Sequence, residues 1–205
     1  MSKANNSKTW IKGHVKDPFV IQAQKDGYRS RAAYKLIEID KKYKIIKPGI
    51  TVVDLGAAPG GWSQVLSKKI GLKGKALGID LLEVSPIKGI DFIQGDFMQD
   101  KILEEMVVKL ENKAVDLVIS DMAPNISGIK ERDNALMINL IDSTLSVVDK
   151  FLGKKGSVLI KVFQGESLDY TRAALKKRFD KVKISKPKAS RPNSNEIYII
   201  GKELK

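Results

Sequence analysis

Residues 51–63 read TVVDLGAAPGGWS, and this stretch decides the fold. Two valines typical of a buried strand lead to an aspartate at the strand end, and a helical pattern runs from Trp62 to Ile70. Between them, glycines allow the backbone to turn tightly and to approach a ligand closely. They are Gly56, Gly60 and Gly61. A strand, a glycine turn and a helix in this order are typical of open α/β sheets that bind a nucleotide-like ligand at the carboxyl edge.

The glycine spacing differs from two common nucleotide-binding motifs. It is not the G-x-G-x-x-G of dinucleotide enzymes, and it lacks the G-K-[ST] ending of a phosphate-binding loop. The carboxylate of Asp54 is unfavourable for a diphosphate, but it suits a ligand with an amine and a sulfonium, such as S-adenosylmethionine. The alternative is a plain tight turn, although so many small or rigid residues in succession are unusual for a connector. We therefore predict that Asp54 and Gly56 belong to a site for S-adenosylmethionine.

The composition limits the classes of protein to consider. The chain has 205 residues, of which 42% are hydrophobic, as expected for one globular domain with a real core. It has no cysteine, which excludes disulfides and thiolate metal sites, and its single histidine, His14, argues against a histidine metal site. The first residues lack the apolar segment of a signal peptide, and no apolar run reaches the length of a membrane span. We expect a soluble cytoplasmic protein without a metal.

The net charge of +13 is unevenly distributed. Residues 1–47 contain 12 Lys and Arg against 4 Asp and Glu, and residues 150–205 contain 15 against 5. Residues 48–149 between them are acidic, with 10 against 15. Basic ends around an acidic middle indicate that both ends contribute to one surface for a polyanion. A generally lysine-rich proteome is the alternative, but it does not predict the acidic middle.

We divide the chain into a basic N-terminal arm, residues 1–28, and a single catalytic domain, residues 29–205. The arm has aromatic residues among its cations, and such residues stack on unpaired bases while the cations contact phosphates. An arm whose aromatics attach it to the domain is an equally good interpretation. The aromatic residues in question are Trp10, Phe19 and Tyr28. We expect His14 to be a surface residue.

The remaining elements alternate between strands and helices. Ser30 is placed to cap a helix that runs to about Ile45, and residues 126–132 are expected to form a mobile loop. The last two strands are joined by the basic loop KPKASRPNSN without a helix, so they should pair antiparallel. We expect strands at 52–54, 75–80, 90–94, 115–120, 156–163, 182–184 and 196–200, and further helices at 62–70, 101–111, 135–151 and 168–179.

Four of the expected strands end in an aspartate. These residues are Asp54, Asp80, Asp96 and Asp121. Any one of them is compatible with a helix cap, but four at the same sheet edge indicate a ligand pocket. Asp80 is placed to accept hydrogen bonds from ribose hydroxyls, and Asp96 from an adenine amino group. Lys161 interrupts the apolar strand GSVLIKVF, where a buried charge is costly without a partner, unless the lysine sits exposed at the strand tip.

The sequence closely resembles the FtsJ/RrmJ-like (RlmE) ribosomal RNA 2′-O-ribose methyltransferases from about Trp10 to Ile200. The matching runs are RSRAAYKL, VVDLGAAPGGWSQ, DFIQGDF, SDMAPN, KVFQGE and SRPNSNEIYI. The resemblance implies a Rossmann-like, seven-stranded, mostly parallel methyltransferase sheet with an antiparallel last strand and helices on both faces. It implies a catalytic tetrad of Lys35, Asp121, Lys161 and Glu196. It also implies cofactor contacts at Gly60, Trp62, Asp80, Asp96 and Asp121.

The resemblance further implies S-adenosylmethionine-dependent methylation of a ribose 2′-hydroxyl, on a uridine of 23S ribosomal RNA in the large subunit, by a monomeric enzyme. Lys161 is expected to act as the base or as a cation that steers the alkoxide, Lys35 and Glu196 to orient it and the ribose, and Asp121 to bridge lysine and cofactor. The chain has R-P-N-S-N where the family pattern has R-A-R-S before Glu196, in a loop expected to face RNA. The alternatives are the same chemistry on transfer RNA or an mRNA cap, and a noncatalytic RNA-binding protein. The complete tetrad argues against the last, and the lack of an extension favours ribosomal RNA over the others.

Overall fold

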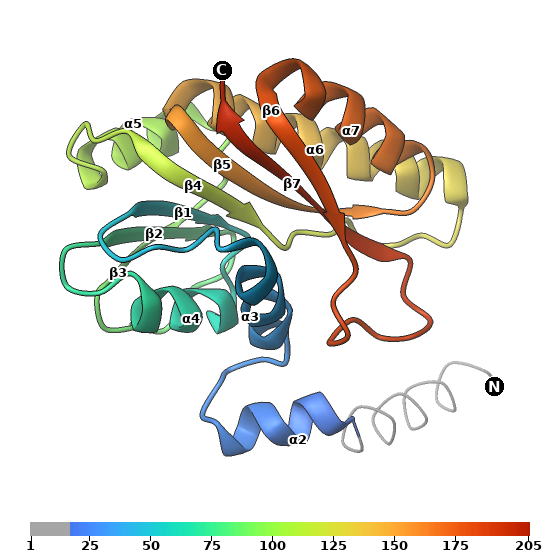
Figure 1. The fold of residues 1–205 in the computed structure, drawn as a ribbon, viewed down its shortest axis with the longest axis horizontal. Coiled ribbons are helices and arrows are strands. Elements are labelled where there is room, and N and C mark those ends of the chain that lie inside the picture. The colour runs from blue at the N-terminus through green and yellow to red at the C-terminus, as the bar shows by residue number, and fades with distance from the viewer. Residues whose placement is uncertain (1–16) are drawn as a thin grey trace.

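The computed structural model describes residues 17–205, which form a seven-stranded sheet with helices on both faces (Figure 1). The strands are β1 (Thr51–Leu55), β2 (Lys75–Asp80), β3 (Ile90–Gln94), β4 (Val115–Ser120), β5 (Leu152–Phe163), β6 (Phe179–Ser185) and β7 (Glu196–Leu204). The helices are α2 (Pro18–Lys25), α3 (Ala32–Tyr43), α4 (Gly61–Lys69), α5 (Asp100–Lys109), α6 (Lys130–Phe151) and α7 (Glu166–Arg178).

The strand order is β3-β2-β1-β4-β5-β7-β6. Strands β1 to β5 pair in parallel, whereas β7 lies antiparallel to both β5 and β6. The predicted sheet is therefore confirmed, including the direction of the last strand. Strands β6 and β7 are joined by a loop without a helix and pair as an antiparallel hairpin. As a result, the carboxyl ends of β1, β2, β4 and β5 meet the start of β7 at one edge.

Two apolar layers sandwich the sheet. Side chains of β1 alternate between them, because successive residues of a strand point to opposite faces. Val53 and Leu55 pack with α5, α6 and α7, whereas Val52 packs with α3 and α4. All five residues of β1 are buried, as expected for the central strand of a parallel sheet covered on both sides. Figure 1 shows α3 and α4 on one side of the sheet and α6 and α7 on the other.

The structure departs from the prediction most clearly at the start of α6 and at Ser30. Helix α6 begins at Lys130, so it includes part of the loop expected at 126–132. Asp133 explains this start, since its carboxylate accepts hydrogen bonds from the backbone N–H groups of Ser127 at 2.7 Å and Gly128 at 3.1 Å. Ser30 does not cap α3, whose N-cap is Arg31 without a side-chain hydrogen bond. The Ser30 hydroxyl lies against Gly61 of the glycine turn instead, so the predicted cap is wrong.

Within the predicted arm, residues Pro18–Lys25 form a helix that the sequence analysis did not anticipate. Asp17 caps it through a hydrogen bond from the backbone N–H of Phe19, and Pro18 occupies its first turn. The Phe19 ring lies 5.7 Å from the ring of Tyr34 in α3, and the Tyr28 ring also lies 5.7 Å from it. These two aromatics attach this part of the arm to the domain, while Trp10 and His14 lie outside the described residues. In residues 17–205, no helix combines the length and apolarity needed to cross a membrane.

Candidate active site

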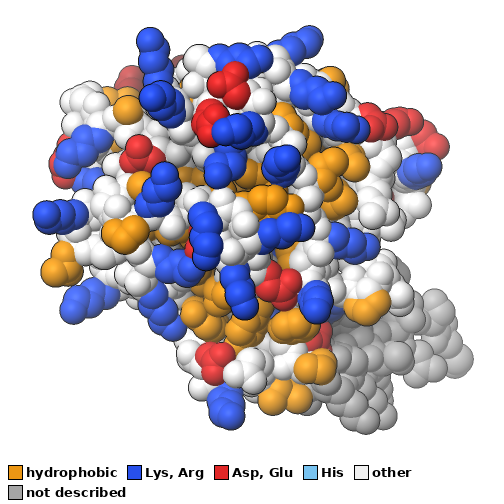
Figure 2. Space-filling view, viewed as in Figure 1, with side chains coloured by type: hydrophobic (Ala, Val, Ile, Leu, Met, Phe, Trp, Pro, Cys, Tyr) orange, Lys and Arg blue, Asp and Glu red, His pale blue; other side chains and the backbone are white. Residues whose placement is uncertain are grey.

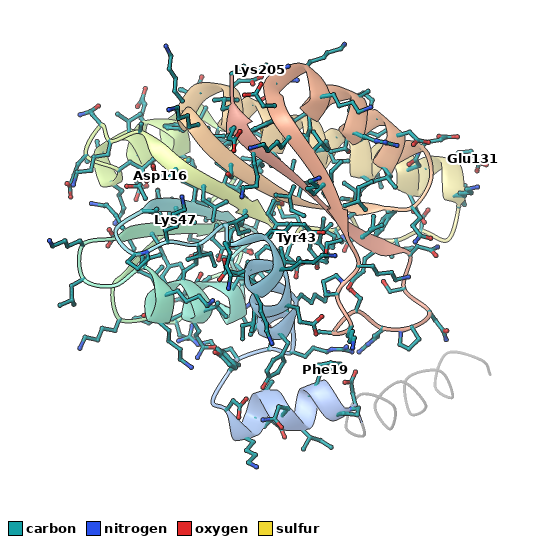
Figure 3. The ribbon with its side chains drawn as sticks, viewed as in Figure 1. Phe19, Tyr43, Lys47, Asp116, Glu131 and Lys205 are labelled. Carbon is teal, nitrogen blue, oxygen red and sulfur yellow. The ribbon has the colours of Figure 1, made fainter. Side chains whose placement is uncertain are left out.

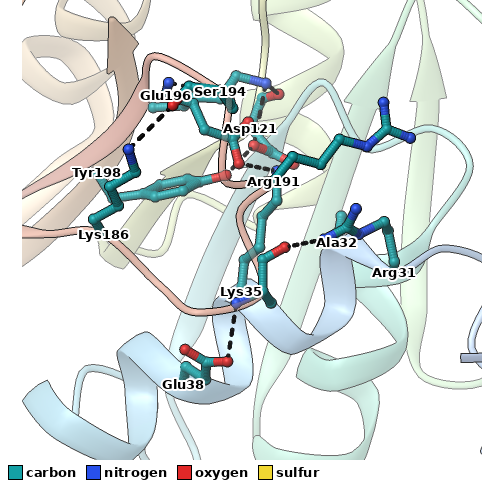
Figure 4. Close-up of polar contacts among 12 residues, drawn as sticks. Arg31, Ala32, Lys35, Glu38, Asp121, Lys186, Arg191, Ser194, Glu196 and Tyr198 are labelled. Atoms are coloured by element: carbon teal, nitrogen blue, oxygen red, sulfur yellow. Dashed lines mark hydrogen bonds and ion pairs between the residues drawn. The ribbon is translucent and has the colours of Figure 1, made fainter. Parts of the chain in front are cut away.

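Four elements bring the predicted tetrad together at the carboxyl edge of the sheet, and Figure 4 labels three of its members, Lys35, Asp121 and Glu196. Lys35 lies on α3, Asp121 follows β4, Lys161 lies near the end of β5, and Glu196 begins β7. The antiparallel direction of β7 brings its first residue to the edge where the parallel strands end. The four residues therefore meet although 161 positions separate Lys35 from Glu196 in the sequence.

The tetrad forms two ion pairs. Lys35 Nζ lies 2.6 Å from Glu196 Oε1, and Lys161 Nζ lies 3.2 Å from Asp121 Oδ1. The Lys161 ammonium also donates a hydrogen bond to the backbone carbonyl of Asp121. All four side chains are largely buried, with exposed fractions of 10% to 17%. Since removing a charge from water is costly, each lysine is held against a carboxylate, and the pairs fix the positions of both ammonium groups.

Tyr198 connects the two pairs, and the sequence analysis missed it. Its hydroxyl donates a hydrogen bond to Asp121 Oδ1 at 2.6 Å, and Lys35 Nζ lies 5.8 Å from the centre of its ring. Burial raises the pKa of Tyr198 well above its usual value, and the negative charges of Asp121 and Glu196 raise it further. The phenol is therefore a permanent hydrogen-bond donor. Its position follows from the strand register, because Tyr198 pairs directly with Lys161 and lies on the same face as Glu196.

The loop before Glu196 is anchored to the helix that carries Lys35. Glu38 of α3 accepts hydrogen bonds from the backbone N–H groups of Lys188 at 2.7 Å and Ala189 at 3.2 Å. Arg31 donates to the carbonyl of Ala189, which is completely buried. Figure 4 labels Arg31 and Glu38 together with Lys35 at helix α3. The departure from the family pattern at residues 191–195 thus lies beyond an anchored segment.

The candidate cofactor side of the edge is rich in carboxylates. Asp54 is buried and accepts a hydrogen bond from the Ser63 hydroxyl at 2.7 Å. Burial raises the pKa of Asp54 to about 7, and the negative charges of Asp121 and Asp80 raise it further, against the lowering effect of Ser63. A positive ligand charge at this edge would relieve that repulsion. The arrangement therefore fits a cationic cofactor, as the sequence predicts for S-adenosylmethionine.

The glycine turn has the backbone shape that its composition predicts. Gly56 and Gly60 have φ angles of 76° and 105°, in the region that side chains disfavour. Asp80 accepts hydrogen bonds from the backbone N–H groups of Ala58 at 2.9 Å and Leu82 at 2.8 Å. These bonds hold the Asp80 carboxylate at the turn, while its oxygens keep further lone pairs for ligand hydroxyls.

Two predicted cofactor residues have a different setting from the others. Trp62 is buried in the layer between α3 and α4, and its indole N–H donates to the carbonyl of Ala32 at 2.8 Å. Its predicted ligand contact is thus restricted to its backbone N–H, which lies in the unpaired first turn of α4. Asp96 accepts a hydrogen bond from the backbone N–H of Met98 at 2.9 Å, which shapes the turn before α5. In residues 17–205, no group of histidines and acids could hold a metal ion.

Comparisons with known proteins identify the family. The sequence profile of the FtsJ-like methyltransferase family matches residues 28–204. The chain is 50% identical to a ribosomal RNA large subunit methyltransferase E from Pseudomonas fluorescens, over 98% of this chain and 96% of the relative. It is 48% identical to the protein of that name from Francisella tularensis subsp. novicida, over the full length of both.

A solved structure also resembles this one. A crystal structure described as a ribosomal RNA methyltransferase from Plasmodium falciparum superposes with a TM-score of 0.78 at 32% identity, covering 86% of this chain and 98% of that one. The profile match includes all four tetrad residues and the whole glycine turn. The chain therefore belongs to the FtsJ-like methyltransferase family.

Proposed function

We propose that this protein transfers the methyl group of S-adenosylmethionine to a ribose 2′-hydroxyl of 23S ribosomal RNA, on a uridine of the large ribosomal subunit. The observation that carries the proposal is the tetrad, in which two buried ion pairs meet at the edge where Asp54 and Asp80 gather. The names of the full-length relatives support ribosomal RNA as the substrate. We further propose a cytoplasmic, monomeric enzyme that needs no metal.

S-adenosylmethionine supplies an activated methyl group on a positively charged sulfur. On this proposal, Asp80 accepts hydrogen bonds from the cofactor ribose and Asp96 from its adenine amino group. Gly56 and Gly60 allow the backbone to approach the ligand, and the N–H of Trp62 is a donor toward it. We assign the remaining contact as electrostatic, between the positive charge of the sulfonium and the carboxylates of Asp54 and Asp121.

At the ribose, Lys161 acts on the attacking 2′-oxygen, which is a poor nucleophile until its proton is removed or its developing charge is stabilised. Asp121 fixes the Lys161 ammonium through its carboxylate and its carbonyl, and Tyr198 holds that carboxylate through its own hydroxyl. Lys35 and Glu196 orient the ribose beside it. Positioning contributes much of the rate, since two reactants held in line avoid the entropy cost of meeting.

The test combines substrate mapping with two variants of Lys161. The enzyme is incubated with methyl-labelled S-adenosylmethionine and separated pools of ribosomal, transfer and capped messenger RNA, and ribose methylation is mapped. We expect label at one 2′-position in 23S RNA. Label confined to transfer RNA or to caps would show that the substrate is one of those RNAs and not ribosomal RNA. The absence of label from every pool would contradict the catalytic assignment.

In the same assay, Lys161→Ala should lower methyl transfer by about 10²-fold or more, the usual scale for a positioned proton-transfer group. Cofactor binding, measured by calorimetry, should stay close to that of the native protein and serves as the control for folding. Lys161→Arg keeps the charge but cannot release a proton at neutral pH. Substantial transfer by the arginine variant would rule out the general-base role and leave electrostatic steering of the alkoxide.

A further inference from the structure

A hollow of about 800 Å³ lies at the opposite edge of the sheet from the tetrad, where β1, β4 and β5 begin. Lysines from separate segments line it: residues after α3, the first part of β5 and the end of β7 all contribute. They are Lys44, Lys47, Lys154, Lys155, Lys202 and Lys205. We call this feature the lysine hollow. Figure 3 labels Lys47, Asp116 and Lys205, which belong to its wall.

The lysine hollow carries more positive than negative charge, and its acids are partly engaged. The acids in its wall are Asp116, Asp180 and Glu203. Asp116 accepts a hydrogen bond from the backbone N–H of Thr51 at 2.8 Å, and Glu203 pairs with Lys181 at 2.7 Å. The hydrogen bond from Lys181 lowers the pKa of Glu203, and the charges of Lys202 and Lys155 lower it further.

Most of the lysines are available to a ligand. Lys202 and Lys205 donate only to backbone carbonyls, of Tyr43 at 3.2 Å and of Lys176 at 3.1 Å. Within residues 17–205, the other four have no carboxylate at ion-pair distance. Lys47 and Lys154 are exposed, from two different segments. A wall of this kind attracts an anion with several charges, because each ammonium acts as an independent point charge.

The lysine hollow and the tetrad open on the same face of the sheet. Ser157, which lines the hollow, and Lys161 are four residues apart on β5, so their side chains point to one side. That separation corresponds to roughly 13 Å along the strand. Helix α3 joins the two places, since Lys35 lies near its start and Lys44 follows its end. Figure 2 shows Lys and Arg side chains spread over the surface seen in the view of Figure 1, with acidic side chains among them.

We infer that the lysine hollow is a second phosphate-binding site for the RNA substrate, which holds the sugar–phosphate backbone beyond the ribose that lies at the tetrad. The inference rests on the proposed function, because it takes the RNA to be the same molecule. On this inference the lysine hollow contributes to the affinity and orientation of the RNA and contacts no atom that reacts. Contacts of this kind are independent of sequence and depend steeply on salt.

The experiment compares three double variants of the full chain. Lys47→Gln/Lys154→Gln removes two charges from the hollow, and Lys47→Arg/Lys154→Arg keeps them. Lys101→Gln/Lys177→Gln is the matched control, since these exposed lysines lie on α5 and α7, which cover the other face. The dissociation constant of a 23S RNA transcript is measured against salt concentration, and S-adenosylmethionine binding by calorimetry reports that each variant is folded.

The hollow Gln variant should bind the RNA more weakly, on the order of tens-fold at 0.1 M salt, with the slope of log K against log salt reduced by roughly 1.5. Its cofactor affinity and its rate at saturating RNA should stay native, and the Arg variant should restore binding. Native RNA binding by the hollow Gln variant, or an equal loss in the control pair, would overturn the inference. Because RNA binding needs no methyl transfer, these outcomes are independent of whether the native enzyme methylates the RNA, which is the test of the proposed function.

Discussion

Replacing Asp54 with asparagine should change how the stability of this protein depends on pH. The carboxyl is buried beneath the glycine turn, and its pKa rises from an ordinary 3.8 to about 7 on folding. A raised folded-state pKa means that the carboxyl contributes most to stability below pH 3.8. That contribution falls as the pH rises toward the folded pKa, because the unfolded chain ionises first. Asparagine has no proton to lose, and its amide oxygen keeps the acceptor for Ser63.

The size of the effect follows from the two pKa values. Between pH 5 and pH 8, ionisation of Asp54 should lower the free energy of unfolding of the native protein by about 2.5 kcal/mol. Urea unfolding of the cofactor-free protein, repeated at several pH values, gives the difference between Asp54→Asn and native protein. That difference should move in favour of the variant by about 2.5 kcal/mol over this range. Asp91→Asn, at an exposed position of β3, is the control and should leave the curve unchanged.

Parallel stability curves for the native and Asp54→Asn proteins would refute the reasoning.

Cofactor binding gives a second readout of the same carboxyl. A sulfonium near Asp54 favours its ionised form, so S-adenosylmethionine should bind more weakly by up to about fivefold on going from pH 7 to pH 6. The demethylated product lacks the sulfur charge and should show little of this dependence. Equal pH dependence for the two ligands would remove Asp54 from the neighbourhood of the sulfur.

Three further predictions concern other residues. Asp80→Ala should weaken S-adenosylmethionine binding by about 1–3 kcal/mol in calorimetry, because a charged acceptor is lost, and unchanged affinity in a folded variant would exclude Asp80 from the site. Tyr198→Phe should lower the free energy of unfolding by about 1.5–3 kcal/mol and reduce methyl transfer, since the Asp121 carboxylate loses a donor; native stability and rate together would contradict this. Deleting residues 1–16 while keeping α2 should weaken RNA binding more than cofactor binding, and an equal loss of both would indicate a structural arm.

The parts of the fold that the sequence predicts well are those with local signals. The glycine turn, the aspartates at strand ends and the hairpin of the last two strands each depend on a few neighbouring residues. The start of α6 was misplaced because its first turn, KERDN, is charged and lacks an apolar stripe. Its helical state depends on the carboxylate of Asp133 reaching back to the preceding loop, which is a three-dimensional contact. The Ser30 cap failed for a similar reason, since packing against Gly61 takes its side chain away from α3.

The residues of the candidate site also differ in how far the sequence predicts them. The tetrad was found through motifs of a known family, because no spacing in the chain indicates that Lys35 and Glu196 are neighbours. Tyr198 was missed because its role depends on the register between β5 and β7, which places it opposite Lys161. A tyrosine among the apolar residues of a strand predicts only a position in the hydrophobic core. Tyr198 nevertheless follows Glu196 by two residues, and residues two apart in a strand lie on the same face. The assignment of Glu196 to the site therefore predicts that Tyr198 lies beside it.

The pairing of charges in the tetrad has a consequence for substrate binding. Lys35 and Lys161 each lie against a carboxylate, so the four side chains together carry no net charge. A neutral site has little long-range attraction for a polyanion, although it can orient one ribose with short contacts. Attraction of RNA must therefore come from basic residues elsewhere, in a protein whose net charge is +13. The lysine hollow is a cluster on the same face whose cations are largely without carboxylate partners in the described chain. Attraction of the RNA and catalysis are then carried out by different lysines. The tetrad lysines stay fixed by their carboxylate partners, while the lysines of the hollow bind the phosphates.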